Sequence, residues 1–347
     1  MKVSRWVMLA VVALLAVGFA IGGALVTSDS GSAAAQATPT IALVSDIGKF
    51  NDRSFNQSQL EGLNRAKTKL GVTILPKQSN SVSDYLPNLT AAIRGHANLV
   101  ISAGFLLANS TATVAKKFPD THFAITDYTV HAAPFADKKG KPLYKNVEGL
   151  TYAANESGCL VGVLAAKMAQ KAGKKVIGAV GGLTIPPVDI WIAGYQYCAK
   201  KAVPGTVVKI GYSQDFGAAD KCKTVAENQI AAGAKVLFQV AGGCGLGTLK
   251  AADEAGIWGI GVDKDQYNDA KRVLTSGVKR VDNGVFQAVA QEKTGKFRAG
   301  GDLLFNLKNG GMSVGKINPS VPKAYIKLMN TYKARIIAGK LKVPAAL

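Results

Sequence analysis

The pattern that decides the fold begins with a short run, Ile41-Ala-Leu-Val-Ser45, and a longer stretch, Ser54-Phe-Asn-Gln-Ser-Gln-Leu-Glu-Gly-Leu-Asn-Arg-Ala-Lys-Thr-Lys-Leu70. The run is apolar and of strand length, whereas apolar residues in the stretch recur at helical spacing. Ser54 with Gln57 three residues later has the form of a capping box, which predicts a helix start, and Gly71 predicts its end. We therefore expect a buried strand followed by an amphipathic helix.

The same alternation continues through the chain in two halves. In the first half, the β-branched runs lie at 41–45, 72–76, 99–103, 123–126 and 146–152. In the second half, they lie at 176–180, 207–210, 236–240 and 258–262. Helical stretches separate these runs, and this order is typical of βαβ units around a mostly parallel sheet. The predicted fold class is therefore α/β, with two Rossmann-like lobes, and a last helix is expected over 322–339.

Aligning the two halves by strand order pairs particular side chains. Asp127 and Asp263 then follow equivalent strands, and Phe55 and Trp191 fall at the opening turn of equivalent helices. Open α/β sheets bind ligands beyond the carboxyl ends of their strands, so these residues would face one cleft. Two facing rings can stack on a flat ligand. Ordinary packing is the alternative for either ring alone, and the matched positions favour the cleft.

Residues 1–37 have the layout of an export signal. Lys2 and Arg5 precede an uncharged apolar run over 6–26, and small residues follow it. At about 20 residues the run could also span a bilayer as an uncleaved anchor, so both readings stay open. We expect the rest of the chain at the periplasmic or extracellular face of the cell membrane, free or tethered by this segment.

The expected export of the chain decides how its four cysteines are interpreted. In an oxidising compartment they are expected to form disulfides, and four cysteines allow three connectivities. We favour Cys159–Cys198 and Cys222–Cys244, because each pair belongs to neighbouring elements. Zinc is the competing interpretation, but the spacings contain no C-x-x-C pair, so no metal site is expected. The first cysteine is Cys159, which excludes a lipid-modified N-terminal cysteine.

The composition and the remaining motifs argue against two other classes of protein. A formal net charge of +20 suggests nucleic acid, but the lysines are spread along the chain without interleaved stacking aromatics. The loop from Gly242 to Gly247 does not meet G-x-G-x-x-G spacing, and no P-loop motif occurs. The three histidines are scattered. We therefore expect neither an enzyme nor a nucleic-acid binder, and no cofactor.

Four motifs carry a resemblance to a known family. They are Asp46-Ile-Gly-Lys-Phe-Asn-Asp-Arg-Ser-Phe-Asn-Gln57, Phe238-Gln-Val-Ala-Gly-Gly-Cys-Gly245, Ile260-Gly-Val-Asp-Lys-Asp-Gln266 and Leu274-Thr-Ser-Gly-Val-Lys-Arg-Val281. In this order they resemble the basic membrane protein (BMP) family, substrate-binding proteins of ABC transporters typified by purine-nucleoside receptors. The resemblance runs from about residue 40 to the end of the chain. It implies a type I periplasmic-binding fold, with two lobes joined by hinge strands.

The resemblance also implies a set of ligand contacts. Phe55 would stack on a nucleobase, with Trp191 opposite, where the family usually has Phe. The implied polar and backbone contacts are Asp46, Asn56 and Asp127 to the base, Asp263 and Lys279 to the ribose, and Gly242 and Gly243 by close approach. Cys244 departs from the family pattern, because a small hydroxyl residue is common at that point of the glycine loop.

Together these features predict a solute-binding protein that captures a purine nucleoside between two closing lobes and passes it to an ABC permease. We expect it to act as a monomer. A receptor for a sugar or another heterocycle on the same fold, or a ligand sensor, is the alternative. The expected lobes are 38–153 with 282–308 and 154–281 with 309–347, with hinges near 152–157, 279–282 and 306–316.

Overall fold

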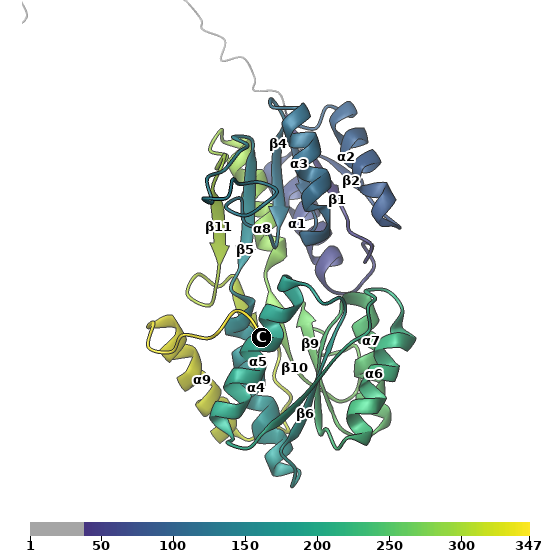
Figure 1. The fold of residues 1–347 in the computed structure, drawn as a ribbon, viewed down its shortest axis with the longest axis vertical. Coiled ribbons are helices and arrows are strands. Elements are labelled where there is room, and N and C mark those ends of the chain that lie inside the picture. Colours follow the sequence, from purple (N-terminus) through teal and green to yellow (C-terminus); the bar gives the residue numbers. More distant parts are fainter. Residues whose placement is uncertain (1–37) are drawn as a thin grey trace, which may run out of the picture. The chain divides into compact units, whose positions relative to one another are not determined.

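The computed structural model describes residues 38–347; the predicted signal or anchor segment lies outside the described residues. Two six-stranded sheets organise this part of the chain. We call the elements around the sheet that contains β1 the N lobe and those around the other sheet the C lobe (Figure 1). Within the described residues, no helix has the length and apolar character needed to cross a bilayer.

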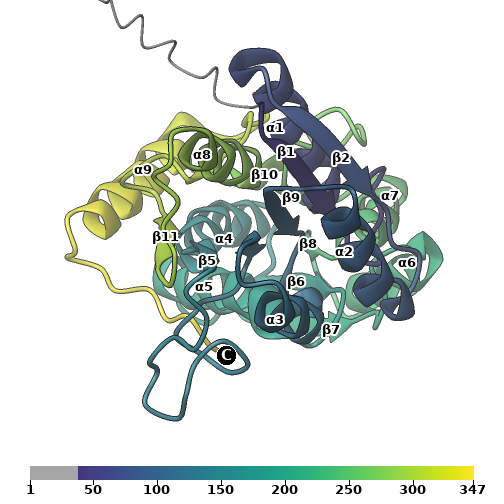
Figure 2. The same ribbon diagram turned by 90° about the horizontal axis from the view of Figure 1, so that it is seen from above.

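The N-lobe sheet is wholly parallel, with the strand order β11-β5-β4-β3-β1-β2. Its strands are β1 (Thr40–Val44), β2 (Thr73–Lys77), β3 (Leu99–Ser102), β4 (His122–Thr126), β5 (Val147–Tyr152) and β11 (Asp302–Phe305). Its helices are α1 (Phe55–Leu70), α2 (Tyr85–Arg94), α3 (Ala108–Lys117) and α8 (Val281–Lys293). Figure 2 shows α8, late in the sequence, lying near α1. The five strands predicted for the first half are confirmed.

The C-lobe sheet has the order β12-β10-β9-β8-β6-β7, and only the pairing of β10 with β12 is antiparallel. Its strands are β6 (Val176–Gly181), β7 (Val207–Tyr212), β8 (Val236–Val240), β9 (Trp258–Asp263), β10 (Val273–Lys279) and β12 (Met312–Val314). Its helices are α4 (Ala154–Lys171), α5 (Pro186–Ala202), α6 (Ala219–Ala231), α7 (Gly245–Glu254) and α9 (Lys323–Ile337). The four strands predicted here and the last helix are confirmed, whereas β10 was not among the predicted strands.

The chain passes between the two sheets three times. It leaves the N lobe after β5, returns after β10, and leaves again between β11 and β12. This connectivity is that of a type I periplasmic-binding fold, the predicted class. We propose that the lobes divide at these crossings, as 38–153 with 282–308 and 154–281 with 309–347.

Two details of the predicted helices are wrong. Ser54 precedes α1, but its side chain makes no capping hydrogen bond, so the capping box is absent. Trp191 does not lie at an opening turn, because α5 begins at Pro186, where proline supplies the fixed φ of a first turn. The predicted end of α1 is confirmed by Gly71, which adopts φ 66°.

Helices α4 and α5 of the C lobe pack with their backbones in contact. A Cβ atom on Gly158 would lie 2.3 Å from the Trp191 carbonyl oxygen, and one on Gly194 would lie 2.0 Å from that of Asn155. A disulfide between Cys159 and Cys198 joins the same two helices. The second disulfide is Cys222–Cys244, so both bonds match the pairing favoured from the sequence. This packing fixes the position of α5 and hence of Trp191.

Candidate functional site

A cavity lies between the lobes, and loops at the carboxyl ends of strands line it. Of the predicted ligand residues, Gly243 alone is outside its lining. The N lobe supplies Asp46, Phe55, Asn56 and Asp127, and the C lobe supplies Trp191, Gly242, Asp263 and Lys279. The positions of these side chains therefore agree with one site, while their roles remain proposals.

The Asp46 carboxylate is held by the loop between β1 and α1. Its Oδ1 accepts hydrogen bonds from Asn56 Nδ2 at 2.7 Å and from the Gly48 backbone N–H at 2.8 Å. Asp46 is buried, and the loss of solvation raises its pKa from 3.8 to about 7, although both hydrogen bonds oppose this shift. Near neutral pH this carboxyl group can therefore gain or lose a proton.

Asp52 caps α1 in place of the predicted Ser54. Its Oδ1 accepts from the backbone N–H groups of Ser54 at 2.9 Å and Gln57 at 3.0 Å, and its Oδ2 accepts from that of Asn56 at 2.8 Å. These are the amides that a helix start leaves without partners. The cap fixes the turn that presents Phe55 and Asn56 to the cavity. The sequence motif of Ser54 and Gln57 led to the wrong capping residue, because Asp52, two residues before Ser54, reaches the amides at the helix start instead.

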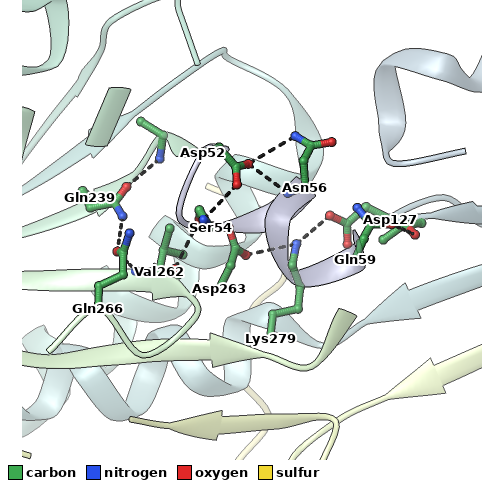
Figure 3. A network of polar contacts seen from close by, with 12 residues as sticks. Asp52, Ser54, Asn56, Gln59, Asp127, Gln239, Val262, Asp263, Gln266 and Lys279 are labelled. Atoms are coloured by element: carbon green, nitrogen blue, oxygen red, sulfur yellow. Dashed lines mark hydrogen bonds and ion pairs between the residues drawn. The ribbon is translucent and has the colours of Figure 1, made fainter. Parts of the chain in front are cut away.

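Three residues that line the cavity form a buried ion triad (Figure 3). Lys279 Nζ is 2.6 Å from Asp127 Oδ2 and 3.6 Å from Asp263 Oδ1. All three side chains are less than a tenth exposed, and burial lowers the pKa of Lys279, but the two carboxylates outweigh burial and raise it. Lys279 is therefore ionised at neutral pH.

The two aspartates of the triad share a backbone geometry. Asp127 directly follows β4 with φ 59°, and Asp263 ends β9 with φ 62°. Few residues other than glycine adopt this left-handed region, and aspartate is among those that tolerate it. The repeat found in the sequence therefore extends to the backbone turn that directs each carboxylate into the cavity.

Aromatic rings also line the cavity, beside aliphatic residues such as Val188 and Val240. The Lys279 ammonium lies 4.7 Å from the ring centre of Phe55 and 6.0 Å from that of Trp191. Phe55 packs closely on the N lobe, since a Cβ atom on Gly104 would lie 3.0 Å from its ring. Trp191 is 1% exposed and lies edge-on to Phe238. The two rings thus differ in burial although both line the cavity.

Phe216 also lines the cavity, and the sequence interpretation missed it. It follows β7, and its carbonyl oxygen accepts a hydrogen bond from the Cys244 backbone N–H at 2.9 Å. The Cys222–Cys244 disulfide therefore secures the loop on which Phe216 rests. A search for aromatics at matched positions of the two halves could not find Phe216, but its place just beyond a strand's carboxyl end is a usable signal.

The cavity between two parallel-sheet lobes is the arrangement of a two-lobed solute-binding protein. The Bmp family model, described as "ABC transporter substrate-binding protein PnrA-like", matches residues 39–346. The chain therefore belongs to this family and is an ABC transporter substrate-binding protein, not an enzyme. Proteins of this class bind small molecules outside the cytoplasm and work with a membrane permease.

Individual relatives agree with this assignment. A Lactococcus lactis subsp. cremoris protein named "ABC transporter nucleoside-binding protein BmpA" is 36% identical, over 88% of each chain. A solute-binding protein of an ABC transporter system from Aeropyrum pernix K1 superposes with a TM-score of 0.77 at 25% identity, covering 88% of this chain and 94% of that chain.

One relative bears on the N-terminal segment. A Pyrococcus abyssi protein, 32% identical over 78% of this chain and 68% of its own length, is described as an uncharacterized lipoprotein. In contrast, this chain has no cysteine before Cys159. That description differs from the expectation that this chain lacks a lipid-modified N-terminal cysteine.

Proposed function

We propose that the protein captures a purine nucleoside in the cavity and delivers it to an ABC permease. The observation that carries this proposal is the combination of aromatic walls with buried carboxylates around one cavity. Phe55, Trp191 and Phe216 offer ring surfaces, and Asp46, Asp127 and Asp263 offer hydrogen-bond acceptors. A nucleoside matches both, because it joins a flat base to a sugar with hydroxyl donors.

Stacking would hold the base. Phe55 is partly exposed and backed by Gly104, so one face of its ring is supported. Trp191 or Phe216, from the opposite lobe, would cover the other face of the base once the lobes close. Stacking of a base on an aromatic ring contributes roughly 1–3 kcal/mol and tolerates different bases. Stacking alone therefore favours a flat ligand without selecting one.

The carboxylates would supply selectivity. We propose that hydrogen bonds from N–H groups of the base are accepted by Asp46, together with the neighbouring Asn56, and by Asp127. Asp263 Oδ1 is buried without a hydrogen-bond partner in the described structure, and a ribose hydroxyl would satisfy it. An unpaired buried acceptor costs about 1–3 kcal/mol, so a ligand without the matching donor should bind more weakly. Lys279, beside Asp263, is proposed to contact the same sugar, with Gly242 and Gly243 offering backbone approach.

A related alternative is a sugar receptor on the same fold, because carboxylates also suit sugar hydroxyls. The four aromatic residues that line the cavity, Phe55, Phe105, Trp191 and Phe216, favour a base over a sugar alone. We further propose that the receptor acts as a monomer at the extracytoplasmic face of the membrane. Hinge motion near 152–157, 279–282 and 306–316 would open and close the cavity.

A thermal-shift screen of the full-length protein tests the proposal. The ligands are inosine, guanosine and adenosine, with the corresponding free bases, ribose and unrelated vitamins as comparisons. We expect at least one nucleoside to raise the melting temperature more than its free base, and ribose to have no effect. Isothermal titration calorimetry then measures the affinity of the strongest ligand. Stabilisation by sugars but by no nucleoside would overturn the proposal.

A further inference from the structure

The segment that enters α1 in the N lobe contacts the end of β9 in the C lobe. The Ser54 hydroxyl donates to Asp263 Oδ2 at 2.8 Å, and Gln266 Nε2 donates to the Arg53 carbonyl oxygen at 3.2 Å. Ser54 and Gln266 are almost completely buried. These two hydrogen bonds join the lobes beside the cavity, and Figure 3 shows the bond between Ser54 and Asp263.

The C-lobe side of this contact is held rigidly. The Gln266 side-chain oxygen accepts hydrogen bonds from Gln239 Nε2 at 2.6 Å and from the Val262 backbone N–H at 2.9 Å. The backbone N–H of Gln266 donates to Ser276 Oγ at 3.0 Å. The side chain and backbone of Gln266 are therefore held by residues of β8, β9 and β10 together. With its oxygen so occupied, its NH₂ group points toward the N lobe.

The periphery of the contact is charged and more exposed. Arg53 Nη1 lies 3.1 Å from Asp269 Oδ1, with 61% of the Arg53 side chain exposed, and Lys264 pairs with Glu61. Exposed pairs of this kind contribute little, because water and salt compete with them. The buried hydrogen bonds of Ser54 and Gln266 should therefore dominate the contact between the lobes.

Asp263 has a different environment at each of its two oxygens. Oδ2 accepts a hydrogen bond from the Ser54 hydroxyl of the opposite lobe, whereas Oδ1 is buried 3.6 Å from Lys279 Nζ and has no hydrogen-bond partner among the described residues; Asp263 itself lines the cavity. A carboxylate fixed at one oxygen has its other oxygen fixed in direction. The contact between the lobes and the orientation of the ligand acceptor thus depend on the same side chain.

We propose that the backbone carbonyl of Arg53 and the hydroxyl of Ser54 form a closure latch with Gln266 and Asp263, respectively, and that Ser54 is a positioning residue that aims Asp263 Oδ1 at the ligand. This inference rests on the proposed function. The latch forms only when the lobes come together, so it retards reopening and release of the ligand. It contributes little to the first encounter, which takes place in the open form.

Stopped-flow kinetics with inosine on full-length Ser54→Ala tests the latch. We expect dissociation to be about tenfold faster, because a hydroxyl–carboxylate hydrogen bond is lost, and association to change by less than about twofold. The melting temperature of the ligand-free variant should stay near that of the wild type. The matched control is Ser58→Ala, which removes a buried hydroxyl one turn further along α1 and should leave both rates unchanged.

A second measurement separates positioning of Asp263 from simple closure. The wild type should prefer inosine over 2′,3′-dideoxyinosine, which lacks the 2′- and 3′-hydroxyls of the sugar, and Ser54→Ala should reduce that preference several-fold. Removing the exposed pair with Arg53→Ala should change dissociation by less than about twofold. An unchanged dissociation rate in Ser54→Ala would overturn the latch, and an unchanged preference would overturn the positioning role.

Failure of the proposed function is distinguishable from failure of the latch. If the wild type binds no nucleoside, the proposed ligand is wrong. The dissociation rates of the wild type and Ser54→Ala are then measured with the compound that gives the largest thermal shift. If the wild type binds inosine and Ser54→Ala releases it at the wild-type rate, the ligand stands and the latch is wrong.

Discussion

The two lobes fix their halves of the cavity by different physical means. In the N lobe, the Asp46 and Asp52 carboxylates accept hydrogen bonds from backbone N–H groups and so hold the loop between β1 and α1. In the C lobe, both disulfides of the chain and backbone contact between α4 and α5 do the equivalent work. The difference shows that polar loops and covalent bonds can position equivalent parts of a repeated fold. It also implies that pH should perturb the N lobe more and reduction the C lobe more.

The sharpest test of this contrast compares Trp191→Ala with Phe55→Ala. Trp191 is fully buried between α5 and the sheet, so its truncation should destabilise the protein by about 3–5 kcal/mol. Phe55 is only partly buried, so its truncation should mainly weaken nucleoside binding, by roughly 1–3 kcal/mol. Urea unfolding and calorimetric titration measure the two effects. Equal losses of stability would contradict the difference in burial, and unchanged affinity in both variants would exclude the stacking model.

The next largest effect concerns Asp46 and pH. Its pKa is about 7 in the folded protein, against 3.8 without burial, so the folded state binds more protons than the unfolded state between these values. The free energy of unfolding should therefore fall as pH rises through this window, by up to about 4 kcal/mol from Asp46. Asp46→Asn keeps an oxygen for Asn56 and Gly48 and should reduce that slope, while Glu148, whose pKa is also raised by burial, continues to contribute to it. Urea unfolding from pH 4 to 8 measures it; an equally steep slope in the variant would count against a raised Asp46 pKa.

Loss of a disulfide should have a slightly smaller effect, confined to the C lobe. The cysteines of Cys159–Cys198 and Cys222–Cys244 are 39 and 22 residues apart in sequence, and closing loops of this size stabilises by about 3–4 kcal/mol. The variants Cys159→Ala/Cys198→Ala and Cys222→Ala/Cys244→Ala should each lose about that amount in urea unfolding. The second should also raise hydrogen exchange near Phe216. Increased exchange in the N lobe, with none near Phe216, would refute the separation of the two lobes.

The sequence predicted most of the fold because its signals are local. Strand runs, the glycine that ends α1 and the matched Asp127 and Asp263 all depend on a few neighbouring residues. The capping residue of α1 was mistaken, because Ser54 and Asp52 are both suitable caps and only the folded loop selects between them. Strand β10 escaped prediction, since Gly277 and the polar residues Thr275 and Ser276 interrupt its apolar pattern.

The residues of the candidate site also fall into two groups, those that the sequence could identify and those that it could not. Residues with a counterpart in the other half, or in a family motif, could be singled out from the sequence. Phe216 could not, because its place in the cavity depends on how the loop after β7 folds against Cys244 and Gly182. The Ser54–Asp263 bond could not either, since it joins residues 209 positions apart across two lobes.

By itself, therefore, the sequence determined the two α/β lobes, the cysteine pairing that neighbouring elements favour, and the side chains that could meet a ligand. Periodicity, turn residues and repetition are local properties, and they are written directly in the order of amino acids. Only the tertiary structure decided which carboxylate caps a helix and which binds Lys279. It alone left one oxygen of Asp263 beside Lys279 without a hydrogen bond, because burial and hydrogen bonding depend on residues that are distant in the chain.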